Sequence, residues 1–88
     1  MKIKKGFTVR NIAGSDIVVP VGNAEKIFNG MITLNESGAF FWNALLKDTT
    51  VNEVVKKVTS EYDVDEERAK ADVEKFIEQL RENNLIEE

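Results

Sequence analysis

The apolar residues of this chain change their spacing once, at the junction of Leu34 and Asn35. Before the junction, two runs rich in β-branched and aromatic residues, Phe7–Ile12 and residues 17–21, flank a short turn, and residues 29–34 form a third run. After the junction, apolar residues recur at the spacing of one helix face. The chain therefore predicts one α+β domain in which a three-stranded antiparallel sheet is followed by three helices.

Three residues typical of helix caps, Asn35, Thr50 and Asp65, stand where the helical spacing begins or restarts. We expect Trp42, the only tryptophan, to lie in the core, because it belongs to the apolar stripe of the first predicted helix. The second and third predicted helices are joined by residues 62–64 alone, which is typical of a helix-turn-helix. Together with the strands, this pattern predicts a winged helix-turn-helix-like fold.

The absence of cysteine and histidine excludes several classes of chemistry. No disulfide, no thiolate or imidazole metal ligand, and no Ser-His or Cys-His nucleophile pair is possible. Composition therefore favours a binding module over an enzyme that works with carboxylates, and we expect no cofactor and no metal ion. The 88 residues suffice for one small domain, in which we expect the basic residues 1–6 to be a flexible tail.

Charge is distributed unevenly along the chain. Residues 1–34 carry a net charge of +3 and residues 35–88 a net charge of −7. The third predicted helix, residues 65–84, has seven acidic and four basic residues, the wrong sign for a helix that approaches DNA phosphates. A winged-helix nucleic-acid-binding regulator is therefore the second hypothesis, kept open by the basic strand region. No stretch approaches the ~20 apolar residues of a membrane span or resembles a secretory signal, so we expect a cytoplasmic protein.

The segment at residues 29–42, which joins the third predicted strand to the first helix, resembles the coenzyme PQQ synthesis protein D (PqqD) family. Residues 62–65, Ala69, residues 72–73, Phe76, Leu80 and residues 85–86 continue the resemblance in the same order, so that it covers residues 7–86. It implies a RiPP recognition element, a small non-catalytic domain that binds the leader of a ribosomally made precursor peptide. Such domains present the leader to a modifying enzyme, often a radical S-adenosylmethionine (SAM) enzyme. The pathway itself does not transfer from the resemblance.

The resemblance also implies where the leader binds: as an added strand on the third strand, packed against the third helix. Strand addition needs an unpaired sheet edge, which the third predicted strand can supply. The same edge also allows a strand-mediated homodimer, so monomer and dimer both stay open. The peptide-binding residues expected on this basis are Phe28, Asn29, Gly30, Met31, Ile32, Thr33 and Leu34 from the strand and Arg68, Asp72, Val73, Lys75 and Phe76 from the helix.

Each part of this expected site has its own chemistry. Main-chain pairing is expected at residues 30–33, and an apolar leader residue is expected near Val73 and Phe76. Arg68 and Lys75 are expected to meet acidic leader residues, and Asp72 a basic one. Gly30 either lets a peptide backbone approach closely or only provides a bend or bulge at the start of the third strand, and the sequence favours the second interpretation.

Overall fold

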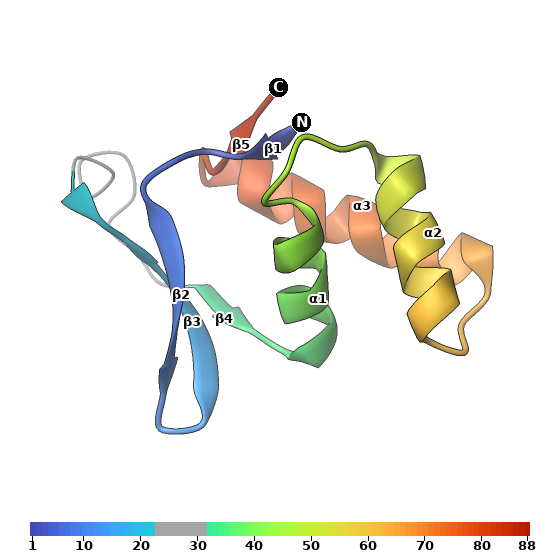
Figure 1. The fold of residues 1–88 in the computed structure, drawn as a ribbon, viewed down its shortest axis with the longest axis horizontal. Helices are drawn as coiled ribbons and strands as arrows, with labels where there is room; N and C mark the ends of the chain where they lie inside the picture. The colour runs from blue at the N-terminus through green and yellow to red at the C-terminus, as the bar shows by residue number, and fades with distance from the viewer. Residues whose placement is uncertain (23–31) are drawn as a thin grey trace.

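The computed structural model describes residues 1–22 and 32–88, and it confirms an antiparallel three-stranded sheet followed by three helices (Figure 1). The sheet lies to one side of the helices, with the strand order β2-β3-β4. Residues 28–31, where part of the third strand was predicted, lie outside the described residues. The elements are β1 (Lys2–Ile3), β2 (Phe7–Ile12), β3 (Ser15–Pro20), β4 (Ile32–Leu34), α1 (Glu36–Ala44), α2 (Val51–Glu61), α3 (Glu66–Glu82) and β5 (Ile86–Glu87).

A two-residue turn, Ala13-Gly14, joins β2 to β3. Both residues have positive φ, +52° and +84°, which is the backbone of a type I′ turn. This turn matches the twist of two antiparallel strands, so it sets the pairing of Ile12 with Ser15 and all the pairs that follow. The register of the hairpin is therefore determined locally.

The three predicted caps are confirmed by hydrogen bonds from the first turn of each helix. The side chain of Asn35 accepts from the Gly38 amide at 2.7 Å, Thr50 from the Glu53 amide at 3.2 Å, and Asp65 from the Arg68 amide at 2.8 Å. Each bond satisfies an amide that has no partner within its helix.

The C-terminal end of α3 turns the chain back onto the core. Asn84 adopts a positive φ of 63°, and the Leu85 amide donates to the Leu80 carbonyl at 2.9 Å. As a result, Leu85 is fully buried and Ile86 lies in β5, next to the core.

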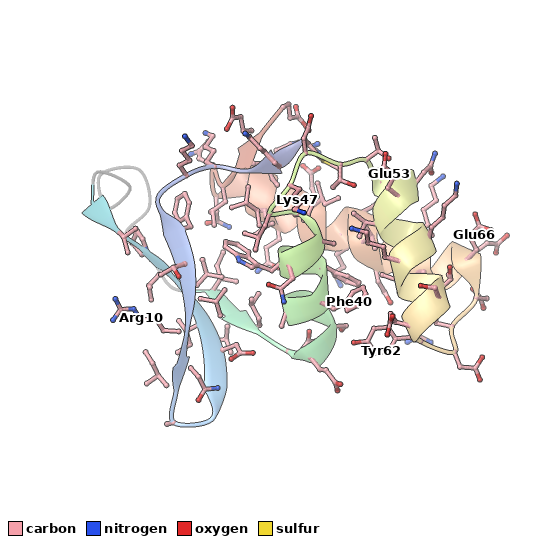
Figure 2. All side chains as sticks on the ribbon, in the orientation of Figure 1. Arg10, Phe40, Lys47, Glu53, Tyr62 and Glu66 are labelled. Carbon is pink, nitrogen blue, oxygen red and sulfur yellow. The ribbon has the colours of Figure 1, made fainter. Side chains whose placement is uncertain are left out.

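The core lies where the helices meet each other and the sheet, and it includes Trp42, which is 3% exposed, as predicted. Around it, Phe40 of α1 packs edge to face on Tyr62, the residue after α2, with ring centroids 5.3 Å apart (Figure 2). This contact ties α1 to the end of α2. In the described part of the chain, no helix combines the length and the apolar character needed to span a membrane.

The expectation of a flexible tail at residues 1–6 is wrong. Strand β1 pairs antiparallel with β5, which aligns Lys2 with Glu87 and Ile3 with Ile86. The Ile3 amide also donates to the Leu45 carbonyl at 2.9 Å, and the Ile3 side chain is buried. A single apolar residue among lysines gives no periodic signal, but the tertiary structure brings an unpaired strand beside it.

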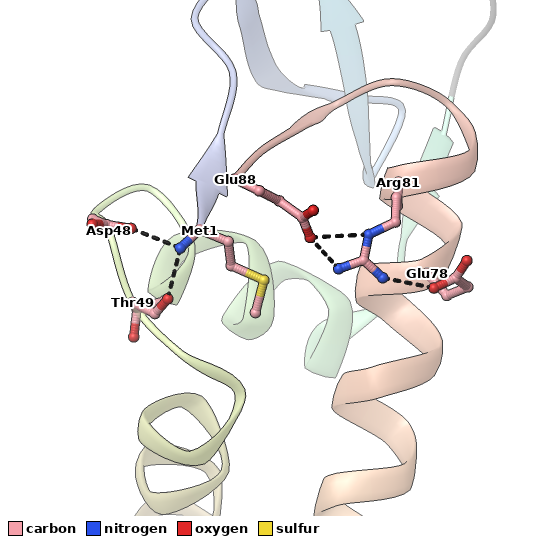
Figure 3. A network of polar contacts seen from close by, with 6 residues as sticks. All are labelled: Met1, Asp48, Thr49, Glu78, Arg81 and Glu88. Carbon is pink, nitrogen blue, oxygen red and sulfur yellow. Dashed lines mark hydrogen bonds and ion pairs between the residues drawn. The ribbon is translucent and has the colours of Figure 1, made fainter.

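Met1 precedes β1, and its α-amino group makes polar contacts with the loop after α1 (Figure 3). It donates to an Asp48 carboxylate oxygen at 2.7 Å and to the Thr49 carbonyl at 3.0 Å. The hydrogen bond and the positive charge of the Met1 ammonium lower the pKa of Asp48 below its usual value of 3.8. The ionised form of Asp48 is therefore favoured by folding.

We expect Asp48→Asn to lower the melting temperature slightly at pH 7, by a few degrees at most, because the ion pair is exposed. A lowered pKa in the folded state stabilises the fold above the ordinary pKa, and the effect is lost as the pH falls through the folded-state pKa. The difference between wild type and variant should therefore begin to shrink near pH 4 in a melting series, and it should be lost only below the lower folded-state pKa of Asp48. Glu61→Gln, which changes an exposed carboxylate, is the control, and a difference for Asp48→Asn that persists at pH 2 would exclude the charge as its cause.

Candidate binding groove

Two adjoining hollows follow the line between β4, the start of α1, and α3. One has a volume of about 410 Å³, and the other, beside β4, has about 270 Å³. They share Asn35, Phe76 and Gln79, so together they form one groove, which we call the α3 groove. The wider hollow is lined in addition by Ser37, Phe41, Arg68, Asp72 and Lys75, and the narrower one by Ile32, Thr33 and Leu34.

The direction of the main-chain groups in β4 follows from the hairpin. Hydrogen-bonded and non-hydrogen-bonded pairs alternate along an antiparallel ladder. The Val21 amide donates to the Gly6 carbonyl at 2.8 Å, which extends the register of β2 and β3 by one hydrogen-bonded pair. Counting back in steps of two, the pair of Arg10 and Ile17 is also hydrogen-bonded, so the N–H and C=O of Ile17 point toward β2.

The neighbours of Ile17 in β3, Asp16 and Val18, therefore direct their main-chain groups toward β4, where they pair with Leu34 and Ile32. Thr33 lies opposite Ile17, and its N–H and C=O point away from β3. Among the described strands, β4 has no second neighbour, so these groups face the open side of the sheet, beside the narrower hollow. Thr33 thus offers one donor and one acceptor to an added strand.

Phe76 forms the apolar floor of the α3 groove and is only partly buried. Its ring packs edge to face on the buried Phe41, with centroids 5.5 Å apart. A Cβ at Gly38 would make only ordinary contacts with the Phe76 ring, at 3.5 Å, and with the Leu34 side chain, at 3.6 Å. The same Cβ would stand 3.0 Å from the capping oxygen of Asn35. The tight contact is therefore with the helix cap, which favours glycine at this position.

The rim of the α3 groove carries three charged residues from α3. The Arg68 guanidinium lies 3.9 Å from the Asp72 carboxylate, one helical turn away. Lys75 forms no ion pair with any residue of the described part. The α3 groove thus combines the Arg68–Asp72 pair, which has no net charge, with a lysine that has no ion-pair partner among the described residues.

The structure brings together most of the expected site residues that it describes. The α3 groove is lined by Ile32, Thr33, Leu34, Arg68, Asp72, Lys75 and Phe76. The expectation for Val73 needs correction: it is fully buried on the core face of α3, with Ala69, Ile77 and Leu80, and does not reach the groove. Phe28, Asn29, Gly30 and Met31 lie outside the described residues.

Three lining residues were missed in the sequence. Asn35 was explained by helix capping and Phe41 by the apolar stripe of the first helix, and Ser37 was given no role of its own. One signal was present: Asn35 directly follows the strand whose edge was expected to bind, so its side chain had to lie close to that edge. The rim residue Gln79 shares a helix face with Arg68, Asp72 and Lys75 by its spacing.

The fold and the groove define a class of protein: a small α+β domain in which the open edge of a short sheet runs beside a long helix. The chain belongs to the coenzyme PQQ synthesis protein D (PqqD) family, whose model matches residues 17–86. The match begins within β3 and ends in β5, and it therefore includes every element that lines the α3 groove.

Two solved structures share this fold over nearly the whole chain. "TbiB1 in complex with the TbiA(beta) leader peptide" has a TM-score of 0.77 and 22% identity, and the match covers 99% of this chain and 95% of that one. "Lasso peptide synthetase B1 complexed with the leader peptide" has a TM-score of 0.73 and 21% identity, with 96% and 93% covered. No sequence among curated proteins matches this chain.

Proposed function

We propose that this protein is a non-catalytic peptide chaperone that binds the leader of a ribosomally synthesised precursor peptide and presents it to a modifying enzyme. The observation that carries the proposal is the edge of β4 at Thr33, beside the narrower hollow of the α3 groove. The N–H and C=O of Thr33 point away from β3 and have no partner among the described strands. Membership of the PqqD family and the leader peptides named in the two similar structures support it.

The groove suits binding by strand addition. In this mode, an extended peptide extends the sheet at β4, and its main-chain hydrogen bonds give affinity with little dependence on sequence. Its side chains alternate, so that every second one is directed toward α3. Phe76 then provides an apolar contact, and the charged rim selects among leaders.

The modifying enzyme is part of the proposal, and it is either a radical SAM enzyme or another enzyme class. The role proposed for this chain itself is binding alone. We also infer that it acts in the cytoplasm, because a precursor peptide is made there by ribosomes and is bound before it is modified.

A nucleic-acid-binding role fits the charges less well. Helix α3 with its cap carries a net charge of −3, and of its four cations Lys75 alone is without an ion pair in the described part of the chain. A helix that contacts phosphates needs several free cations. The basic residues of the first third of the chain would have to supply the contact instead.

An amide chemical-shift titration tests the proposal. The ¹⁵N-labelled protein is titrated with the leader of the precursor peptide encoded beside its gene. We expect shifts at Thr33, Leu34 and along the Arg68–Phe76 face of α3. Shifts confined to β1, β5 or α2 would contradict the proposed groove.

Two further measurements separate the alternatives. Duplex DNA is titrated in parallel, and salt-sensitive shifts with DNA but none with peptide would favour the regulator. Sedimentation over a range of protein concentrations tests the edge-mediated homodimer. If a dimer forms through β4, the leader should dissociate it, because both compete for the same edge.

A further inference from the structure

The pairing of charges on α3 distinguishes Lys75 from the other cations of the helix. Arg68 is paired with Asp72, Lys70 with Glu74 at 4.0 Å, and Arg81 with Glu78 at 2.8 Å. Arg81 also binds Glu88, which holds the end of the chain (Figure 3). The carboxylates three residues before and after Lys75 are thus both engaged by arginines.

Lys75 also gives the α3 groove its net positive charge. The charged residues that line the groove are Arg68, Asp72 and Lys75, with a net charge of +1, although α3 as a whole is acidic. Arg68 and Asp72 carry opposite charges 3.9 Å apart, so together they add no net charge to the groove. The groove therefore presents one positive charge at its rim, and this charge lies beside the apolar ring of Phe76 in the sequence.

An added strand on β4 would present its side chains to α3 at intervals of two residues, roughly 6.6–6.8 Å apart. Phe76 lines both hollows, whereas Lys75 lines only the wider one. A strand that places one groove-facing side chain on the Phe76 ring can therefore direct the next one into the wider hollow, which Lys75 lines. The peptide residue that contacts the ring and the peptide residue that contacts the ammonium group would then be two positions apart in the peptide.

Resting on the proposed function, we propose that Lys75 makes the α3 groove selective for leader segments that carry Asp or Glu two residues from a large apolar residue. The apolar residue packs on Phe76, and the carboxylate binds the Lys75 ammonium. Arg68 and Asp72 satisfy each other and contribute little to the choice of charge. This assigns the charge specificity to one residue, rather than to all three charged residues of the rim.

A selection from a displayed library of random twelve-residue peptides tests this assignment. Wild type, Lys75→Glu and the control Lys70→Glu are each used as the folded, full-length target. Lys70 is the matched control because it is an exposed lysine of α3 whose partner Glu74 lies outside the α3 groove. We expect wild type and Lys70→Glu to enrich Asp or Glu two positions from a large apolar residue, and Lys75→Glu to enrich Lys or Arg there.

Binding of one enriched synthetic peptide then gives the magnitude. Replacing its acidic residue with the matching amide should weaken binding to wild type by about two- to fivefold at low salt, and much less at 0.5 M salt. The same replacement should leave the affinity of Lys75→Glu unchanged or increase it. Apolar enrichment without an acidic preference, or the same preference in Lys75→Glu, would overturn the assignment while leaving the proposed function intact. A library that yields no peptide dependent on Thr33 or Phe76 would overturn both.

Discussion

Replacing Trp42 by alanine is expected to lower the free energy of unfolding by about 3–5 kcal/mol. Trp42 is 3% exposed and packs among the buried residues of all three helices and the sheet. Its removal leaves a cavity that neighbouring side chains fill only in part. Because a small domain has a total stability of only about 5–15 kcal/mol, this loss brings the protein close to unfolding. Urea denaturation followed by circular dichroism measures it.

Leu46→Ala is the matched control for Trp42→Ala. Leu46 follows the same helix but is 54% exposed, so its removal should change stability by no more than about 0.5 kcal/mol. If Trp42→Ala shifts the transition no more than the control does, Trp42 does not hold the core together. The tryptophan would then have to lie at the surface, contrary to its observed burial.

Thr33→Pro is expected to weaken leader binding about five- to 150-fold while the protein stays folded. Proline has no N–H, so the donor at the open edge of β4 is lost and a carbonyl of the bound peptide stays unpaired, at a cost of roughly 1–3 kcal/mol. The fold survives because the Thr33 N–H points away from β3 and takes no part in the ladder. Proline is tolerated at such edge positions. Calorimetric titration with the leader peptide measures the affinity.

Two further variants test the geometry behind this prediction. Thr33→Ala keeps the N–H, so it should bind nearly as well as wild type. Ile32→Pro removes an N–H that points toward Val18 of β3, so it should unfold or strongly destabilise the protein. If Thr33→Pro unfolds the protein and Ile32→Pro does not, the alternation derived for β4 is reversed. If Thr33→Pro folds and binds normally, the leader does not pair with this edge.

The charge test at Lys75 and the edge test at Thr33 examine different parts of one groove. Rim charges chiefly alter the association rate and the salt dependence, whereas main-chain and apolar contacts set the dissociation rate. The two variants should therefore change different rate constants of leader binding. Lys75→Glu should slow association at low salt, and Thr33→Pro should speed dissociation. This separation identifies the edge of β4 as the source of affinity and α3 as the source of specificity.

Much of the fold could be predicted from the sequence, because it is determined by neighbours along the chain. The caps Asn35, Thr50 and Asp65 each bond an amide three residues away. Helical and strand spacing depend on the alternation of apolar residues over one or two turns or a few strand residues. The acidic character of α3, which argues against DNA, is a matter of composition alone.

The candidate site was only partly predictable, because it lies between elements that are distant in the sequence. The spacing of apolar residues in α3 could not tell which of Val73 and Phe76 is buried in the core and which borders the groove. The two residues lie three positions apart, on neighbouring parts of one helix face. In the folded chain, Phe76 packs on Phe41 of α1 and borders the groove, whereas Val73 is fully buried in the core.

The sequence by itself determined which segments are strands and helices, where the helices begin, and which residues are apolar enough to form the core. Only the tertiary structure decided that β1 joins β5, that Thr33 directs its main-chain groups away from β3, and that Lys75 lines the groove without an ion pair to any described residue. The physical reason is distance along the chain. Local spacing reports hydrogen bonds and contacts within a few residues, whereas sheet edges, ion-pair partners and groove walls depend on segments that meet only when the chain is folded.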